Sequence, residues 1–174
     1  GRKLQVAKTF DNDEREELVK ALCKYIDPSK GTLFAQNVGF EKGRIKELAG
    51  IFPEYKDKLM AMYNRGFDLM WLVNTNAALY EELGFDKERA SLPNYYNKDL
   101  SGSYSIKKTL PVFSDLSYKD LTVKNGTEAI VAYATYNSMT KEEYDLYYEA
   151  LRIYCQQDTW AMVVILEALR KLCQ

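Results

Sequence analysis

Residues 32–41 read Thr-Leu-Phe-Ala-Gln-Asn-Val-Gly-Phe-Glu, and this stretch decides the fold class. Its first four residues form a short apolar run after a turn cluster, which predicts a buried strand. From about Phe40 to Phe52, apolar side chains recur at helical spacing, which predicts a helix. A strand that leads directly into a helix is the repeating unit of α/β proteins, so we expect the α/β class.

Outward from this stretch the sequence predicts mainly helices. Weak alternation predicts a strand at Leu4–Phe10, and residues 66–69 predict a second brief strand. Helical spacing predicts further helices over residues 13–26, 54–64, 105–110, 127–136 and 140–172, the first opened by a capping box of Asp13 and Glu16, the last by one of Thr140 and Glu143. The last helix is long for a globular protein, which favours a bend near residues 156–158. Residues 84–103 read as a long loop, and about three strands are expected in all.

Length and composition narrow the function classes. With 174 residues the chain has room for one domain with a sizeable core, and we expect residues 1–174 to form one. Lys plus Arg is 24 and Asp plus Glu is 25, which argues against a basic nucleic-acid coat and an acidic tail. The chain has no histidine, which excludes Ser-His-Asp triads and histidine-bearing zinc sites within it. Any chemistry must therefore use carboxylates, tyrosine, lysine or cysteine.

Cysteine usage and hydropathy bear on the compartment. The three cysteines lie far apart and form no CxxC pair, so we expect reduced thiols and a cytoplasmic setting. No apolar run reaches the roughly 18 residues of a membrane span, and we expect no membrane partner. The chain starts with Gly1 in strand-like sequence. We therefore interpret it as a fragment of a larger domain with one or more strands upstream.

Two carboxylates occupy unexpected helical positions. Asp158 lies in the apolar stripe of the last helix, and Tyr154 shares its face four residues earlier. Glu41 stands four residues before Ile45, in the apolar stripe of the helix at 40–52. An unpaired carboxylate on a buried face costs roughly several kcal/mol, so each needs a cation or hydrogen-bond donors. The alternatives are that Glu41 favours a helix N-terminus, that Asp158 caps a second helix after a bend, and that Tyr154 is a core residue.

Three short segments in this order resemble a known arrangement. Asn37-Val-Gly-Phe-Glu41 resembles the second motif of the DnaQ-like 3′–5′ exonucleases, Asn-x-x-Phe-Asp, at a strand-to-helix junction. Tyr154-Cys-Gln-Gln-Asp158 resembles their third motif in its tyrosine form, and Phe67-Asp-Leu69 resembles the strand after the second motif. Longer segments at 37–49, 102–111, 125–129 and 154–163 resemble the bacterial domain of unknown function 2779, which is grouped with the ribonuclease H-like exonucleases. This resemblance runs from about residue 10 to 173.

The resemblance implies metal-dependent hydrolysis of nucleic-acid phosphodiesters at single-stranded DNA or RNA ends. Two divalent ions, Mg²⁺ or Mn²⁺, would bind at carboxylates. Asp158 would be a metal ligand, and Glu41 would take the acidic place of the second motif. Tyr154 would orient the attacking water or help to deprotonate it. Asn37 would support the strand end or contact substrate. The implied fold is a helix-rich fragment of a ribonuclease H-like fold.

The sequence departs from the family pattern in two ways. The second-motif acid is Glu41 rather than aspartate, so its carboxylate reaches one methylene further. The first motif, Asp-x-Glu on an apolar strand, is absent, and the acids near Asp13 are better explained as helix caps. We therefore expect the first motif upstream. The chain then holds about half of a four-carboxylate site and is expected to be inactive alone.

Polar and basic side chains suggest where substrate could bind. A cluster follows the long loop, and two cations flank Glu41; together these candidates are Ser103, Tyr104, Ser105, Lys107, Lys108, Lys42 and Arg44. They could hold phosphates, with Tyr104 stacking on a base. The alternative is an ordinary solvated surface. The tyrosines at 144, 147 and 148 could pack against another domain of the same polypeptide.

Two competing interpretations stay open. The chain could be a non-catalytic nucleic-acid-binding or protein-interaction module that retains the fold, because the change at Glu41 and the missing first motif both permit it. It could instead be a mainly helical interaction domain whose motif matches arise by chance. An upstream strand ending in Asp-x-Glu would favour the nuclease.

Overall fold

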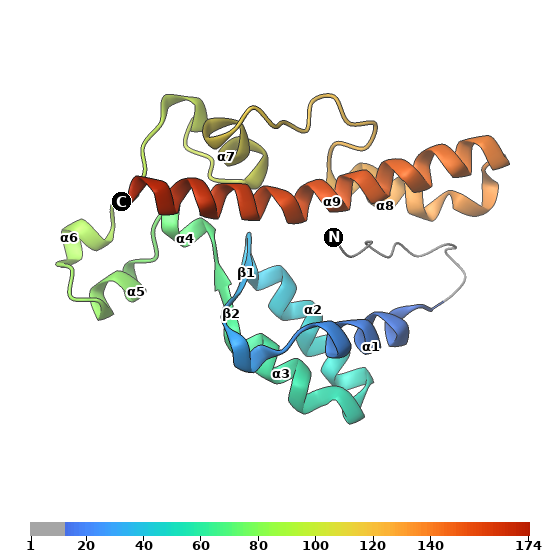
Figure 1. The fold of residues 1–174 in the computed structure, drawn as a ribbon, viewed down its shortest axis with the longest axis horizontal. Helices are drawn as coiled ribbons and strands as arrows, with labels where there is room; N and C mark the ends of the chain where they lie inside the picture. The colour runs from blue at the N-terminus through green and yellow to red at the C-terminus, as the bar shows by residue number, and fades with distance from the viewer. Residues whose placement is uncertain (1–12) are drawn as a thin grey trace.

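The computed structural model describes residues 13–174 (Figure 1). Its α-helices and strands, in chain order, are α1 (Arg15–Tyr25), β1 (Leu33–Ala35), α2 (Val38–Ile51), α3 (Lys56–Arg65), β2 (Gly66–Asp68), α4 (Met70–Val73), α5 (Ala77–Glu82), α6 (Lys87–Ala90), α7 (Ile106–Phe113), α8 (Gly126–Ala134) and α9 (Lys141–Leu172). Short 3₁₀ turns lie at Pro28–Lys30, Pro53–Tyr55, Lys98–Leu100 and Tyr136–Ser138. The strand expected at Leu4–Phe10 lies outside the described residues.

The two strands form a parallel pair. Leu33 lies opposite Gly66 and Ala35 opposite Asp68, so both strands end at the same edge. Parallel strands need a long crossover, and α2 with α3 supplies it. The predicted strand-to-helix step at 32–41 and the brief strand at 66–69 are confirmed. The described part of the chain is thus rich in helix, with one small parallel sheet.

Helices α1, α2 and α3 enclose a local core. Its buried members come from all three helices: Val19, Cys23, Leu48, Ala49, Leu59 and Met62. The capping box predicted for α1 is wrong. Glu14 is the N-cap and makes no side-chain cap, whereas the Asp13 carboxylate accepts hydrogen bonds from the backbone and guanidinium of Arg15, the latter at 2.7 Å. The Asp13 carboxylate binds the Arg15 guanidinium and does not cap the helix, although the spacing from Asp13 to Glu16 fits a capping box.

Helix α9 is one continuous element of 32 residues that runs across the molecule (Figure 1). Its predicted capping box is confirmed, because the Thr140 side chain and Glu143 bond each other's backbone N–H. The helix continues without a break through residues 156–158. The Thr159 hydroxyl donates to the carbonyl of Cys155 at 3.1 Å within the helix, and Asp158 lies in the helix interior. Asp158 is therefore not an N-cap.

Two further apolar clusters are built on α9. The central cluster joins it to the start of α4 and to α7 through the buried residues Leu69, Leu110, Tyr118, Ala161 and Ile165. The second lies between α8 and the start of α9, with Val123, Ala132, Tyr136, Ala150 and Leu151 buried. Residues Tyr144, Tyr147 and Tyr148 pack partly buried against this second cluster. These tyrosines therefore have partners within the chain.

A buried tyrosine in the second cluster carries a polar group without a partner. Tyr136 is 4% exposed, and among the described residues its hydroxyl has no hydrogen-bond partner. Burial raises its pKa from 10.0 to about 12, and the neighbouring hydroxyls of Tyr144 and Tyr148 add to the shift. A hydroxyl buried without a hydrogen bond costs about 1–3 kcal/mol.

We expect Tyr136→Phe to stabilise the protein by about 1 kcal/mol at neutral pH, because it removes that hydroxyl. The pKa is raised on folding, so the unfolded chain loses its proton first and the wild type loses stability as pH rises from 10.0 to about 12. The variant lacks this loss. Urea denaturation at pH 7 and at alkaline pH measures both effects. A variant that is no more stable than wild type at pH 7 contradicts the prediction.

Two features bear on the expectations about membrane spans and cysteine thiols. Among the residues that the structure describes, no helix combines the length and apolar character needed to cross a membrane. The thiols of Cys23, Cys155 and Cys173 are free.

Candidate functional site

Asp68 organises the edge where both strands end. It is 4% exposed, and its carboxylate accepts three backbone hydrogen bonds, each 3.0 Å long, from Asn37, Val38 and Met70. Asn37 takes a left-handed conformation, with φ 64°, which turns the chain from β1 into α2. One side chain therefore joins the end of β2 to the first turns of α2 and α4. Asp68 serves as a cap for these helices, with both oxygens engaged.

Glu41 lies in the first turn of α2, beside this edge. Its side chain is largely exposed, so the expectation that it continues the buried stripe is wrong. Partial burial raises the pKa of its carboxyl, the nearby charge of Asp68 raises it further, and a backbone N–H opposes the shift. A carboxylate at the N-terminus of a helix is also favoured by the helix dipole. Glu41 thus faces solvent at the strand edge.

The second carboxylate lies in a half-buried cluster on α9. The hydroxyl of Tyr118 donates a 2.7 Å hydrogen bond to Oδ1 of Asp158. Tyr154 lies one helical turn earlier on the same face of α9, close enough for its hydroxyl to lower the pKa of the Asp158 carboxyl. Lys107 of α7 lies close enough for its charge to act on Asp158, and its Nζ is 5.9 Å from the centre of the Tyr118 ring. The structure therefore places Tyr154, Asp158 and Lys107 near one another.

The electrostatics of this cluster follow from burial. Burial raises the pKa of Asp158, while the hydrogen bond from Tyr118, the nearby hydroxyl of Tyr154 and then the charge of Lys107 lower it. Burial and the Asp158 charge raise the pKa of Tyr154 to about 12. The pKa of Tyr118 is raised for the same reasons. Both tyrosines are therefore hydrogen-bond donors at neutral pH.

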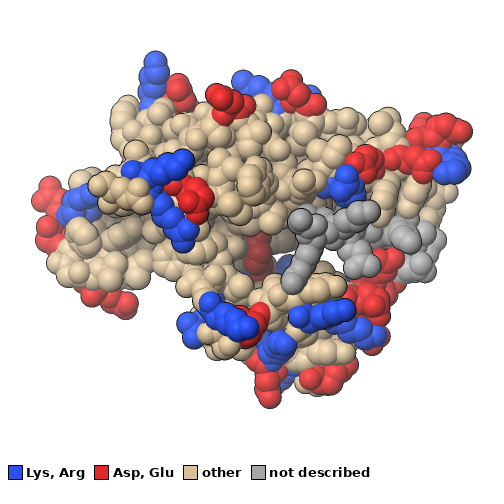
Figure 2. Space-filling view, viewed as in Figure 1, with Lys and Arg blue, Asp and Glu red and all other residues tan. Residues whose placement is uncertain are grey.

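Contacts connect the strand edge with the α9 cluster. The side-chain amide of Gln36, at the end of β1, donates to the carbonyl of Tyr104 at 2.7 Å. Phe34 of β1 and Tyr154 of α9 both pack against the central apolar cluster. In Figure 1 the end of β1 points toward the middle of α9, and Figure 2 shows a hollow between these parts with charged atoms inside it. The two groups of candidate residues thus flank one region.

The expected substrate residues divide into two groups. Tyr104 and Lys107 are partly buried in this region, and Ser103, Ser105 and Lys108 are exposed around the start of α7. The hydroxyl of Tyr104 donates to the carbonyl of Tyr95 at 3.3 Å. The second group is the two cations near Glu41, Lys42 and Arg44, which make contacts away from this region.

Lys42 and Arg44 make local contacts. The Nζ of Lys42 lies 5.2 Å from the ring centre of Tyr63, and its chain covers Gly66 at the amino end of β2. Arg44 forms a 2.7 Å ion pair with Glu47. These contacts lie away from the edge at which both strands end, so neither cation joins the Asp158 cluster.

The described residues include two of the carboxylates expected at a metal centre. Glu41 and Asp158 supply carboxylate oxygens, which Mg²⁺ and Mn²⁺ prefer. Within residues 13–174 no group of three or more acidic or cysteine side chains is arranged to hold an ion. The oxygens of Asp68 already accept backbone N–H groups. A two-metal centre of the family type would need acids from outside the described residues.

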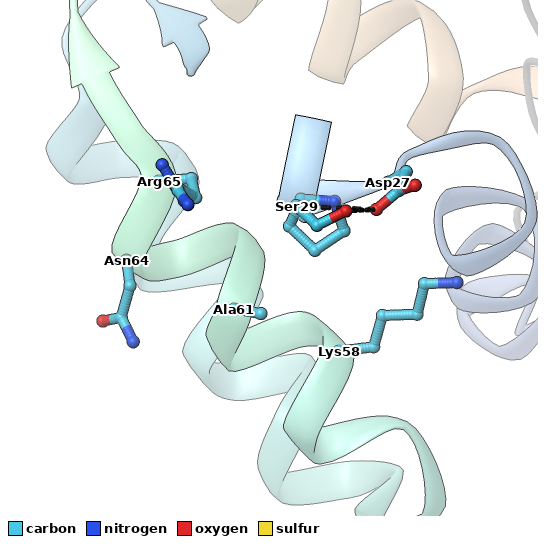
Figure 3. Close-up of a pocket in the computed structure, with 7 residues that line it drawn as sticks. Asp27, Ser29, Lys58, Ala61, Asn64 and Arg65 are labelled. Carbon is cyan, nitrogen blue, oxygen red and sulfur yellow. Dashed lines mark hydrogen bonds between the residues drawn. The ribbon is translucent and has the colours of Figure 1, made fainter. Parts of the chain in front are cut away.

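A separate depression of about 700 Å³ lies beside α3 (Figure 3). Its wall is formed by Asp27, Pro28, Ser29, Lys58, Ala61, Asn64 and Arg65. In Figure 3 Asp27 bonds Ser29, a 2.6 Å contact between carboxylate and hydroxyl. No residue expected at the functional site lines this depression.

Sequence reasoning missed three residues of the site. Tyr118 and Gln36 belong to no motif, and their partners are 40 and 68 positions away in the chain. Asp68 stood in a motif-like strand, but its role as a cap was not expected. The signal for Asp68 is an acid at the end of an apolar strand. Tyr118 carries no comparable signal, because only the tertiary fold brings it to Asp158.

Comparisons with known proteins place the chain in a family. The family described as Domain of unknown function (DUF2779) matches residues 2–105. The uncharacterised protein UU173 of Ureaplasma parvum serovar 3 is 28% identical over 151 residues, covering 78% of this chain and 20% of the relative. The uncharacterised protein MG366 of Mycoplasma genitalium is 28% identical over 143 residues, covering 74% and 19%.

The chain thus spans about a fifth of the length of these two curated relatives. No solved structure matches it significantly. The family match covers more than half of the chain and includes β1, α2, β2 and Asp68 at the strand edge. On this match, the chain belongs to the DUF2779 family.

Proposed function

We propose that this chain is the carboxy-terminal part of a ribonuclease H-like, metal-dependent phosphodiesterase domain of the DnaQ-like exonuclease type. The observation that carries the proposal is that Tyr154 and Asp158 lie one turn apart on one face of α9, where Tyr154 packs on the same apolar cluster as Phe34 of β1. This pair has the spacing of the third exonuclease motif. In open α/β sheets ligands bind outside the carboxyl ends of the strands, where Glu41 and Asn37 lie.

The proposed chemistry is cleavage of a phosphodiester at the end of a single strand. Asp158 and Glu41 would hold part of a metal centre, whose ions, when bound, stabilise the attacking and leaving oxygens. Tyr154, protonated in this environment, can orient a water but does not remove its proton. Lys107, whose charge acts on Asp158, can bind a phosphate oxygen. Ser103, Ser105 and Lys108 lie beside it at the start of α7.

The remaining acids of the centre would come from outside the described residues. The full-length polypeptide that contains this chain is therefore expected to be active, whereas the chain alone is expected to be inactive. The experiment is an assay of both on labelled single-stranded DNA and RNA with Mg²⁺ or Mn²⁺. Degradation of neither substrate by the full-length polypeptide would show that the proposal is wrong.

One observation favours a second candidate, a nucleic-acid-binding module without catalysis. Both oxygens of Asp68 are held by backbone groups, and residues 13–174 contain no three-acid metal group. A module of this kind would bind labelled strands without degrading them, with the same affinity in the presence and absence of EDTA. A metal-dependent loss of full-length substrate would exclude it.

A further inference from the structure

The ring of Tyr118 is held by two kinds of contact, apart from its hydrogen bond to Asp158. Its side chain is 5% exposed and packs in the central apolar cluster with Leu110 and Ile165. Its ring meets the Tyr154 ring edge-on, with centroids 6.1 Å apart and an interplanar angle of 63°. Because the ring is packed on these sides, the position of its hydroxyl oxygen is fixed. That oxygen lies 2.7 Å from Oδ1 of Asp158.

The segment that carries Tyr118 has a second tie to α9. The side-chain amide of Gln157 donates to the carbonyl of Ser117 at 3.0 Å. Two neighbouring residues of α9 thus bond two neighbouring residues of the segment. The Gln157 bond holds the segment alone, whereas the Tyr118 bond also fixes a carboxylate. Removing one bond or the other therefore distinguishes the effect of holding the segment on α9 from the effect of orienting the Asp158 carboxylate.

We propose that Tyr118 is a positioning residue, whose hydroxyl holds the Asp158 carboxylate in the orientation that binds a divalent cation. The inference rests on the proposed function, because it takes Asp158 as a metal ligand. Tyr118 lies outside the part of the chain that matches the family, at residues 2–105, and outside the motif that contains Asp158. Carboxylate ligands are commonly held by hydrogen bonds from a second layer of residues, and loss of such a bond typically costs about 10–100-fold in metal affinity or activity.

The geometry explains why this carboxylate needs a fixed orientation. An aspartate on a helix can rotate about its side-chain bonds, and binding a metal would then cost the entropy of ordering it. The bond from Tyr118 orders the carboxylate beforehand. Tyr154 lies on the same helix as Asp158, whereas Tyr118 approaches from a different segment. The orientation of the Asp158 carboxylate is therefore fixed relative to a segment outside α9 as well as to α9 itself.

The test compares two single substitutions in the full-length polypeptide. Tyr118→Phe removes the hydroxyl and keeps the packed ring, and Gln157→Ala removes the other tie and leaves the carboxylate bond. Mn²⁺ binding is measured by the electron paramagnetic resonance signal of the free ion, and the Mn²⁺ that Asp158→Ala fails to bind defines the site. Strand degradation is measured against Mn²⁺ concentration, and urea denaturation reports the stability of each variant.

We expect Tyr118→Phe to bind Mn²⁺ at this site at least about 10-fold more weakly. Its degradation rate at saturating Mn²⁺ should stay within about threefold of wild type, while Gln157→Ala binds Mn²⁺ like wild type. The proposal is overturned if Tyr118→Phe binds normally, if Gln157→Ala loses as much affinity, or if no Mn²⁺ binding depends on Asp158. If Mn²⁺ binding depends on Tyr118 but no strand is degraded, the positioning role stands and the phosphodiesterase proposal fails.

Discussion

Replacement of Asp158 by alanine in the full-length polypeptide is expected to slow strand degradation at least about 100-fold. A metal ligand stabilises the transition state by several kcal/mol, and each 1.36 kcal/mol is a factor of ten in rate. Asp158 is a half-buried carboxylate that accepts a hydrogen bond from Tyr118, and among the described residues no group of three or more acids is arranged to hold an ion in its place. Initial rates on labelled single strands at fixed Mg²⁺ measure the effect.

Two further variants separate chemistry from folding. Asp158→Asn keeps the shape of the side chain and an oxygen that can accept from Tyr118, so it should fold normally and still be nearly inactive. Asp120→Ala changes an exposed aspartate and should leave the rate within about twofold of wild type. If Asp158→Asn retained the wild-type rate, Asp158 would not be a metal ligand.

Replacement of Asp68 by alanine is expected to lower the free energy of unfolding by about 4 kcal/mol. Three backbone N–H groups, those of Asn37, Val38 and Met70, lose a charged acceptor, and hydrogen bonds to charged groups contribute about 1.5–3 kcal/mol each. Water can reach some of these donors after the substitution, so the expected loss in the free energy of unfolding is smaller than the sum of the three hydrogen-bond contributions. Urea denaturation measures the loss.

Hydrogen exchange gives the matching local readout for Asp68. The amides of Asn37, Val38 and Met70 should exchange faster in Asp68→Ala, because the turn from β1 into α2 loses its acceptor. Asp68→Asn should be intermediate, since an amide offers one acceptor oxygen instead of two. Asp120→Ala should change stability by less than about 0.5 kcal/mol. Wild-type stability in Asp68→Ala would show that the carboxylate does not hold this edge together.

Local sequence patterns predicted much of the secondary structure. The apolar run before Gln36, the helix after it and the Thr140–Glu143 capping box depend on neighbours a few residues apart, and each is confirmed. The helix expected over residues 127–136 corresponds to α8, and the side chain of Asn125 caps it by accepting a hydrogen bond from the backbone N–H of Glu128 at 2.9 Å. Such features are set by short-range hydrogen bonds and periodic burial.

The sequence failed where a distant residue decides the outcome. The alternative that Asp158 caps a second helix is wrong, because Asp158 lies inside the continuous helix α9 and accepts a hydrogen bond from Tyr118, which belongs to another segment. The periodic position of Glu41 suggested burial, yet no element within residues 13–174 covers the first turn of α2 enough to bury it. Helical spacing identifies a face but does not show where the neighbouring elements end.

The three apolar clusters also bear on the order in which the chain folds during synthesis. The cluster of α1–α3 is complete by Met62, and contacts between residues close in sequence form fastest. The other two clusters take Ala161, Ile165 and Leu151 from the final helix. A ribosome that is still making α9 therefore carries one complete apolar cluster and two incomplete ones, whose apolar surfaces stay exposed until α9 has emerged.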